Sequence, residues 1–235
     1  DEIFPSMLEA IRGAQKSICL ESYIFWKGKV GTEFTEALCR KASEGVVVNM
    51  LVDWLGSKDF DRKLLEQLRA CGVHVFFYHP IRWYTLSRLN NRTHRKIMVV
   101  DGKIGFVGGV GIADEWQGNG LQPKRWRDTH YRVTGPVVAQ MQAAFSDNWI
   151  MSQEEVPHGD RYFPDLTGEV QPQEGDFKVT AQMFQSGSDE GASSLRLLFL
   201  YSIAAAKRSI DISSPYFVPD EYTVHQLMKA SVERG

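Results

Sequence analysis

Residues 94–111 read HRKIMVVDGKIGFVGGVG. Two short stretches, 95–100 and 104–108, flank the Asp-Gly pair at 101–102, a pattern typical of two strands joined by a turn. On a strand, side chains two residues apart point to the same face. His94 and Lys96 are therefore expected to lie together near the start of the first strand, beside the polar stretch at 90–93.

The segments around this motif alternate between strand and helix patterns. Helical periodicity of apolar residues predicts helices over 3–14, 30–44, 59–70 and 137–149. Residues rich in β-formers predict strands over 17–25, 46–52, 73–78, 95–100, 104–108 and 129–133. The run 46–52 is apolar apart from Asn49, as in a strand buried on both faces. This alternation predicts the α/β class, with a mixed and largely buried β-sheet flanked by helices.

Composition sets limits on the class of protein. The chain has 235 residues, 43% of them hydrophobic and 24% charged, with a net charge of -2. These values are ordinary for a globular protein, and no global field attracts polyanions. No apolar run approaches the roughly 20 residues that span a bilayer. Because the chain opens at Asp1 while already entering a helix, and ends directly after another, we expect it to be excised from a longer protein.

The three cysteines are scattered through the first third of the chain. Cys19, Cys39 and Cys71 form no CxxC pair and no Cys/His spacing suited to a metal. We therefore expect reduced, packed thiols and a reducing compartment.

A repeat indicates the domain organisation. LEAIRGAQKSICLESYIF at 8–25 resembles LYSIAAAKRSIDISSPYF at 200–217, and a helix containing Lys-Ala-Ser follows each. Identity at non-apolar serines favours duplication over two unrelated amphipathic segments. We expect a first domain at 1–151, a linker at 152–177, and the incomplete N-terminal part of a second copy at 178–235.

The His94–Lys96 pair suits phosphoryl chemistry. A neutral imidazole can attack phosphorus near pH 7, and an ammonium beside it can offset charge on the non-bridging oxygens. Backbone N–H groups of a glycine run can approach an anion closely, and we expect phosphate binding at Gly108, Gly109 and Gly111.

The region around the motif is basic. Residues 67–100 contain no Asp or Glu but hold Arg69, Arg82, Arg88, Arg92, Arg95 and Lys96, and a second basic group follows at Lys124, Arg125 and Arg127. Basic enrichment in so long an acid-free stretch favours an anion site over a merely solvated surface.

Two carboxylates are candidate partners of this pair. A neutral nucleophilic histidine needs its far nitrogen held by a carboxylate or carbonyl, and Asp128 in WRDTH is the best candidate. We expect its carboxylate within hydrogen-bond reach of a His94 ring nitrogen. Asp101 completes the H-x-K-x4-D spacing and belongs with the catalytic set on that ground, but its place beside Gly102 favours a structural role. No cluster of acidic, His and Cys residues has ligand spacing, so we expect neither a metal nor another cofactor.

This motif carries a specific resemblance. H-x-K-x4-D followed six residues later by Gly-Gly is the signature of the phospholipase D superfamily, and the chain is most similar to bacterial cardiolipin synthases. The similar stretches are NNRTHRKIMVVDGKIGFVGG at 90–109, IADEW at 112–116, WRDTH at 126–130, QAAF-x3-W at 142–149 and SPYFVPD at 214–220. The resemblance implies a phospholipase D-like sheet and two H-K-D copies that share one site about a pseudo-twofold axis. One histidine becomes phosphatidylated and the other protonates the leaving alcohol, without a metal.

Carried onto this sequence, the resemblance gives each residue a role. His94 is one of the catalytic pair, Lys96 binds phosphate and Asp128 orients His94. It implies a phosphatidyltransferase of phospholipid biosynthesis that converts two phosphatidylglycerol molecules into cardiolipin and glycerol. The chain departs from the family at Gly111, where asparagine is usual, and it lacks a second H-K-D motif. We therefore expect this piece alone to be inactive.

The resemblance also implies partners and location. The expected partners are anionic phospholipid (phosphatidylglycerol), a membrane surface, and either the missing C-terminal half of the second domain or a second copy. Nucleic acid is not expected, and Trp83, Tyr84 and Leu86 among basic residues favour a membrane interface. The implied location is the bacterial inner membrane with the catalytic part on its cytoplasmic side, this piece itself being soluble. The alternatives are a phospholipase D-type hydrolase, a nuclease using the same motif, or a non-catalytic lipid-binding module.

Overall fold

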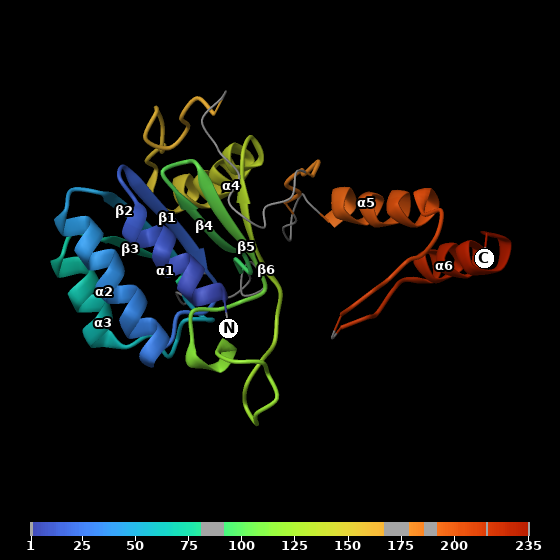
Figure 1. Cartoon of the computed structure of the whole chain (residues 1–235), viewed down its shortest axis with the longest axis horizontal. Coiled ribbons are helices and arrows are strands. Elements are labelled where there is room, and N and C mark those ends of the chain that lie inside the picture. Colours follow the sequence, from blue (N-terminus) through green and yellow to red (C-terminus); the bar gives the residue numbers. More distant parts are fainter. Residues whose placement is uncertain (1, 81–91, 167–178, 186–191, 215, 235) are drawn as a thin grey trace. The chain divides into compact units, whose positions relative to one another are not determined.

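A computed structural model describes residues 2–80, 92–166, 179–185, 192–214 and 216–234 (Figure 1). The chain forms two compact units, Asp1–Met183 and Phe184–Gly235. The first unit is built on a six-stranded sheet in the order β3-β2-β1-β4-β5-β6. Its strands are β1 (Ser17–Ser22), β2 (Val47–Asp53), β3 (His74–Tyr78), β4 (Lys96–Val100), β5 (Ile104–Gly108) and β6 (His130–Thr134). The first three strands are parallel and the last three antiparallel, which confirms the predicted mixed sheet.

Helices cover both faces of this sheet. The helices α1 (Ile3–Gly13), α2 (Lys29–Ser43) and α3 (Arg62–Ala70) bury one apolar cluster against one face, and α4 (Val137–Gln153) buries a second cluster that includes Phe145 and Trp149. In β2 every residue after Val47 is buried, as the apolar run predicted. Figure 1 shows α1 and α2 side by side over the strands. No helix in the described part of the chain is long and apolar enough to cross a bilayer.

Strand register brings four residues into one row at one edge of the sheet. Ser22 at the end of β1 pairs with Lys96 at the start of β4. Gly108 at the end of β5 pairs with His130 at the start of β6. The β4–β5 pairing of Ile97 with Val107, continued by one residue, sets Lys96 beside Gly108. Paired residues share a face, so Lys96 and His130 project on the same side of this edge.

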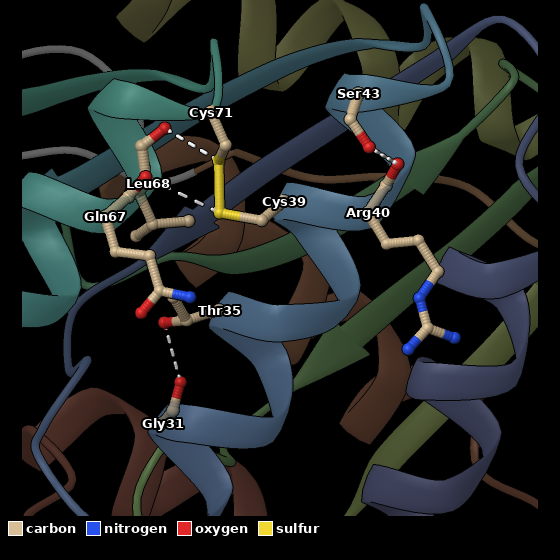
Figure 2. The surroundings of a disulfide bond; sticks show 8 residues. All are labelled: Gly31, Thr35, Cys39, Arg40, Ser43, Gln67, Leu68 and Cys71. Carbon is tan, nitrogen blue, oxygen red and sulfur yellow. Dashed lines mark hydrogen bonds between the residues drawn. A yellow bond between two sulfur atoms is a disulfide. The ribbon is translucent and has the colours of Figure 1, made fainter.

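The cysteine prediction is wrong for two of the three residues. Cys39 on α2 and Cys71 at the end of α3 form a disulfide, with Cα atoms 5.4 Å apart (Figure 2). The two helices pack side by side on one face of the sheet, a proximity that a separation of 32 residues does not reveal. Cys19 is a free, buried thiol as predicted, and burial raises its pKa to about 12.

The first unit extends into the predicted linker. Tyr162 is 8% exposed, packs in the cluster beneath α4, and its hydroxyl accepts a hydrogen bond from Asn49 (3.1 Å). Ser17 donates a hydrogen bond to the Arg161 carbonyl (2.8 Å). Apolar and polar contacts together hold this stretch, which sequence alone showed only as aperiodic.

The second unit has helices α5 (Ala192–Ala205) and α6 (Glu221–Arg234). Arg234 donates to the carbonyls of Ile203 (2.7 Å) and Ala204 (2.6 Å), which satisfies the end of α5. By the repeat, 209–217 corresponds to the strand predicted over 17–25, but the described residues 209–214 lie outside helix and strand. A strand needs a neighbour for its backbone groups, and the described residues of the second unit contain no counterpart of β2 or β4 to supply one. The second pseudo-twofold copy therefore stays a prediction.

Candidate functional site

His94 and Lys96 meet at the edge of the sheet. Lys96 is 7% exposed, and its Nζ lies 3.0 Å from His94 Nε2 and 2.9 Å from the His94 carbonyl oxygen. The Tyr23 ring lies under both groups, 4.8 Å from the His94 ring centroid and 5.4 Å from Lys96 Nζ. As an ammonium, Lys96 donates to the lone pair on Nε2, which leaves the ring proton on Nδ1. The histidine ring is therefore neutral and held with Nε2 towards the cation.

Electrostatics support this protonation state. Burial, and then the charge of Lys96, lower the pKa of His94, while Asp53 opposes the shift. Burial lowers the pKa of Lys96 to about 8, and Asp128 opposes that shift. At pH 7 the imidazole is mainly neutral and the ammonium mainly charged. These are the states required of a nitrogen nucleophile and of a cation that binds an anion.

His130 forms the third side of this site. It lies in the same row as Lys96, and burial lowers its pKa to about 4, with Asp128 opposing the shift and Lys96 reinforcing it. Both of its ring nitrogens are buried, and neither has a hydrogen-bond partner among the residues that the structure describes. A cavity of about 10 Å³ is lined by both His130 and Lys96, together with Ser22 and neighbouring apolar residues. A space of that size holds about one water molecule.

Asp128 is not where the sequence placed it. Its carboxylate accepts a hydrogen bond from the Thr129 amide (2.7 Å), and no hydrogen bond joins it to His94 in the described structure. Asp128 precedes β6, on the far side of β5 from β4, whereas the His94 ring contacts the Tyr23 ring just after β1. Its charge instead favours the protonated forms of Lys96 and His130. The predicted role of Asp128 in orienting His94 stays a prediction.

The carboxylate that acts on His94 is Asp53, which sequence reasoning missed. Asp53 is fully buried at the end of β2 and accepts hydrogen bonds from the amides of Leu55 (2.9 Å), Gly56 (3.0 Å) and Thr93 (3.2 Å). It therefore fixes the residue immediately before His94. An acid ending a continuously apolar strand was the available signal, because such a group is rarely buried without a purpose.

Glu21 is a second missed carboxylate. It is fully buried on β1, its Oε1 accepts from the Thr93 hydroxyl and from Asn148 Nδ2 (2.6 Å), and burial raises its pKa. Asn148 also lies 3.3 Å from Thr93 Oγ1. The backbone and the side chain of Thr93 are thus held by Asp53 and Glu21 respectively. Thr93, the residue that precedes His94, is therefore held from two strands.

Asp101 lies at the opposite end of β4 from Lys96. Its carboxylate accepts hydrogen bonds from the amides of Gln15 (2.8 Å), Lys16 (2.7 Å) and Ser17 (2.9 Å). At about 3.3 Å per residue, it is some 16 Å along the strand from Lys96. These contacts fit the structural role predicted for Asp101, which joins β4 to the start of β1.

The glycines after β5 serve backbone packing. The Gly109 amide donates to the Thr129 carbonyl (3.1 Å), so this N–H is already bonded and does not present the anion contact that was expected. A Cβ at Gly109 would lie 2.1 Å from Asp128 Oδ2, and one at Gly111 would lie 2.9 Å from Ile24 Cβ. The asparagine that the resemblance implies at 111 does not fit this packing without movement of Ile24.

Two arginines of the basic stretch bind backbone carbonyls of the first unit. Arg92 donates to the His79 carbonyl (2.8 Å) and Arg95 to the Ala144 carbonyl (2.7 Å). Arg82 and Arg88, like Trp83, Tyr84 and Leu86, lie outside the described residues. Within the described ranges, no group of three or more His, Cys, Asp and Glu side chains is placed to hold a metal.

Comparisons with known proteins agree on one family. The profile described as "Cardiolipin synthase, PLD-like domain" matches residues 7–149. The chain is 34% identical to Cardiolipin synthase 1 of Bacillus anthracis over 99% of its own length and 46% of the relative. It is 36% identical to Cardiolipin synthase A of Pseudomonas fluorescens strain SBW25 over 100% of its own length and 47% of the relative. The chain thus spans about half the length of the curated relatives it matches.

A solved structure shares the fold. The polyphosphate kinase of Porphyromonas gingivalis aligns with 98% of this chain and 34% of its own, with a TM-score of 0.53 and 14% sequence identity. At that identity the likeness concerns the arrangement of strands and helices alone.

Proposed function

The chain belongs to the cardiolipin synthase family of phospholipase D-like proteins, and from that premise we propose that its His94–Lys96 site transfers a phosphatidyl group from phosphatidylglycerol to an alcohol acceptor. The observation that carries the proposal is the 3.0 Å contact between Lys96 Nζ and the His94 Nε2 lone pair. It joins a neutral nitrogen nucleophile to a buried cation. Lys96 begins β4, and His94 follows Thr93, which Asp53 and Glu21 hold in place.

The first step forms a phosphatidyl-histidine. As the phosphate enters, a Lys96 N–H moves from Nε2 to a non-bridging oxygen, which frees the lone pair to attack phosphorus. The bond from phosphorus to the glycerol headgroup oxygen breaks, and that oxygen takes a proton from a general acid. In the second step the general acid, now deprotonated, acts as a base and takes the proton from the hydroxyl of a second phosphatidylglycerol. Its oxygen attacks phosphorus, and the P–N bond breaks to release His94 and cardiolipin.

We propose that residues 1–235 supply one half of this site. The sequence contains one His-x-Lys motif, and the general acid must stand opposite the nucleophile. That general acid comes from the remainder of the second copy or from another molecule of this chain. The proposed setting is a bacterial membrane surface, where phosphatidylglycerol is available.

Labelled phosphatidylglycerol, resolved by thin-layer chromatography, tests the proposal against its alternatives. The active form should convert it to cardiolipin, and His94→Ala should lower turnover by several orders of magnitude, as loss of a nucleophile does. A variant that keeps more than about a tenth of the rate contradicts the role of His94. Phosphatidic acid as the main product identifies a hydrolase, cleavage of single-stranded DNA a nuclease, and binding without turnover a lipid-binding module. A purified monomer of residues 1–235 with robust turnover contradicts the half-site proposal.

A further inference from the structure

Exposed apolar side chains gather in loops at the same sheet edge as His94. Because β1 and β2 are parallel and β4, β5 and β6 alternate in direction, this edge receives the loops that follow β1 and β2 and the loop from β5 to β6. In these loops Trp54 and Leu55 are each 39% exposed, Trp126 is 57% exposed and Leu121 is 84% exposed. Figure 1 shows the green β5–β6 segment extending past the end of the sheet.

Hydrogen bonds and ring contacts hold the β5–β6 loop in place. Asp114 accepts hydrogen bonds from the amides of Lys29 (3.0 Å) and Val30 (2.8 Å), which fastens the loop to the start of α2. Trp116 stacks against Trp126 at 6.0 Å, and the Trp126 amide donates to the Glu115 carbonyl (2.7 Å). These contacts hold Trp126 outward in a defined position, so its exposure is a property of the fold.

Trp116 connects this loop to the body of the unit. Its ring lies 6.3 Å from that of Trp26, and Trp26 Nε1 donates to the Gly56 carbonyl (2.8 Å) in the loop after β2. The loop bearing Leu121 and the loop bearing Trp54 are therefore connected through the ring contacts of Trp116 and Trp26. Their exposed side chains lie at the same edge of the sheet as His94.

The positive charge of the β5–β6 loop favours an anionic partner. Residues 117–127 read QGNGLQPKRWR, which contain Lys124, Arg125 and Arg127 and no acid. Lys124 and Arg127 are exposed beside Trp126. Two of the three flanking acids are engaged elsewhere: Asp114 accepts hydrogen bonds at the start of α2, and Asp128 acts on Lys96 and His130, while Glu115 precedes the loop by two residues. Aromatic side chains settle at headgroup depth, and cations there meet anionic lipid.

We infer that residues 117–127 form the docking surface that seats the His94 edge on an anionic phospholipid bilayer. Leu121 and Trp126 enter the headgroup layer, and Lys124 and Arg127 bind its phosphates. The inference rests on the proposed function in one respect: a lipid substrate is the reason for bringing His94 to a membrane.

Vesicle binding by residues 1–235 tests this surface. Sedimentation with vesicles of phosphatidylcholine alone, and of phosphatidylcholine mixed equally with phosphatidylglycerol, gives two partition coefficients for each protein. Wild type should prefer the anionic vesicles, and Lys124→Gln with Arg127→Gln should lower that partition by about 30-fold. Leu121→Ser should lower it by about tenfold. Circular dichroism establishes that each variant is folded.

Matched controls lie at the opposite edge of the sheet. Arg12 and Arg40 are exposed near the ends of α1 and α2, and Phe163 is 38% exposed near the turn that follows β4. Arg12→Gln with Arg40→Gln, and separately Phe163→Ser, should leave the partition unchanged. Equal losses in loop and control variants, or wild-type binding by the loop variants, overturn the inference. So does binding to single-stranded DNA through these side chains with no vesicle binding. Vesicle binding is measured without turnover, so the two proposals fail separately: a catalytically complete form that consumes no phosphatidylglycerol contradicts the proposed function and leaves the docking surface standing.

Discussion

Reduction of the Cys39–Cys71 disulfide should destabilise the first unit by a measurable amount. The bond closes a loop of 32 residues that contains the end of α2, β2 and α3. In the chain-entropy description, a closed loop of that length restricts the unfolded chain by about 3.7 kcal/mol at 25 °C. For a unit of this size, that corresponds to a fall in melting temperature of roughly 7–15 °C. The loss should appear mainly as a lower urea midpoint.

Urea unfolding followed by tryptophan fluorescence, with and without a thiol reductant, measures the effect. Cys39→Ala should match the reduced wild type and gain nothing from oxidation. Cys19→Ala is the matched control, since this free thiol lies outside the bond and the difference between oxidised and reduced protein should remain. A thiol titration of the unfolded, unreduced protein should find one thiol. Three thiols, or equal midpoints for oxidised and reduced protein, refute the reasoning.

Three further predictions follow from the site. Because the pKa of Lys96 is about 8, deprotonation removes its charge as pH rises through that value, so kcat/KM should fall about tenfold per pH unit above it, while any residual turnover of Lys96→Arg stays flat. Gly111→Asn should lower the free energy of unfolding by about 1–3 kcal/mol in urea titrations, because its Cβ would crowd Ile24, and Ile24→Ala should recover part of that loss. Turnover by the active form should survive EDTA, since Lys96 supplies the positive charge; complete loss that Mg²⁺ or Zn²⁺ alone restores would contradict this.

Most of the first unit's fold could be predicted from the sequence because its signals are local. The apolar run at 46–52 became the interior strand β2, and the Asp-Gly pair became the turn between β4 and β5. The strand expected at 209–217 had the same local signal as β1 but did not form in the described residues 209–214. The difference is long-range: β1 is hydrogen-bonded to β2 and to β4, and a strand's stability depends on such neighbours.

The site was predictable only where strand periodicity governs it. Spacing of two residues placed His94 beside Lys96, and the structure has that contact. The partner of His94 was not predictable, because it depends on strand order. In the strand order β5 separates Asp128 from β4, whereas β1 and β2 bring Glu21 and Asp53 to Thr93.

Glu21 and Asp53 explain how His94 is held in position. Burying an ionisable group costs free energy unless hydrogen bonds compensate for it. Glu21 is surrounded on its face of the sheet by apolar neighbours such as Cys19 and Leu51, where another apolar side chain would fold with less cost. Its compensating bonds go to Thr93 and Asn148, and those of Asp53 also reach Thr93. Two buried acids on adjacent strands thus converge on the residue that precedes His94. The cost of burying these two acids falls where their hydrogen bonds fix the backbone that leads to His94. The contacts of the His94 ring with Tyr23 and Lys96 then set the direction of its Nε2 atom.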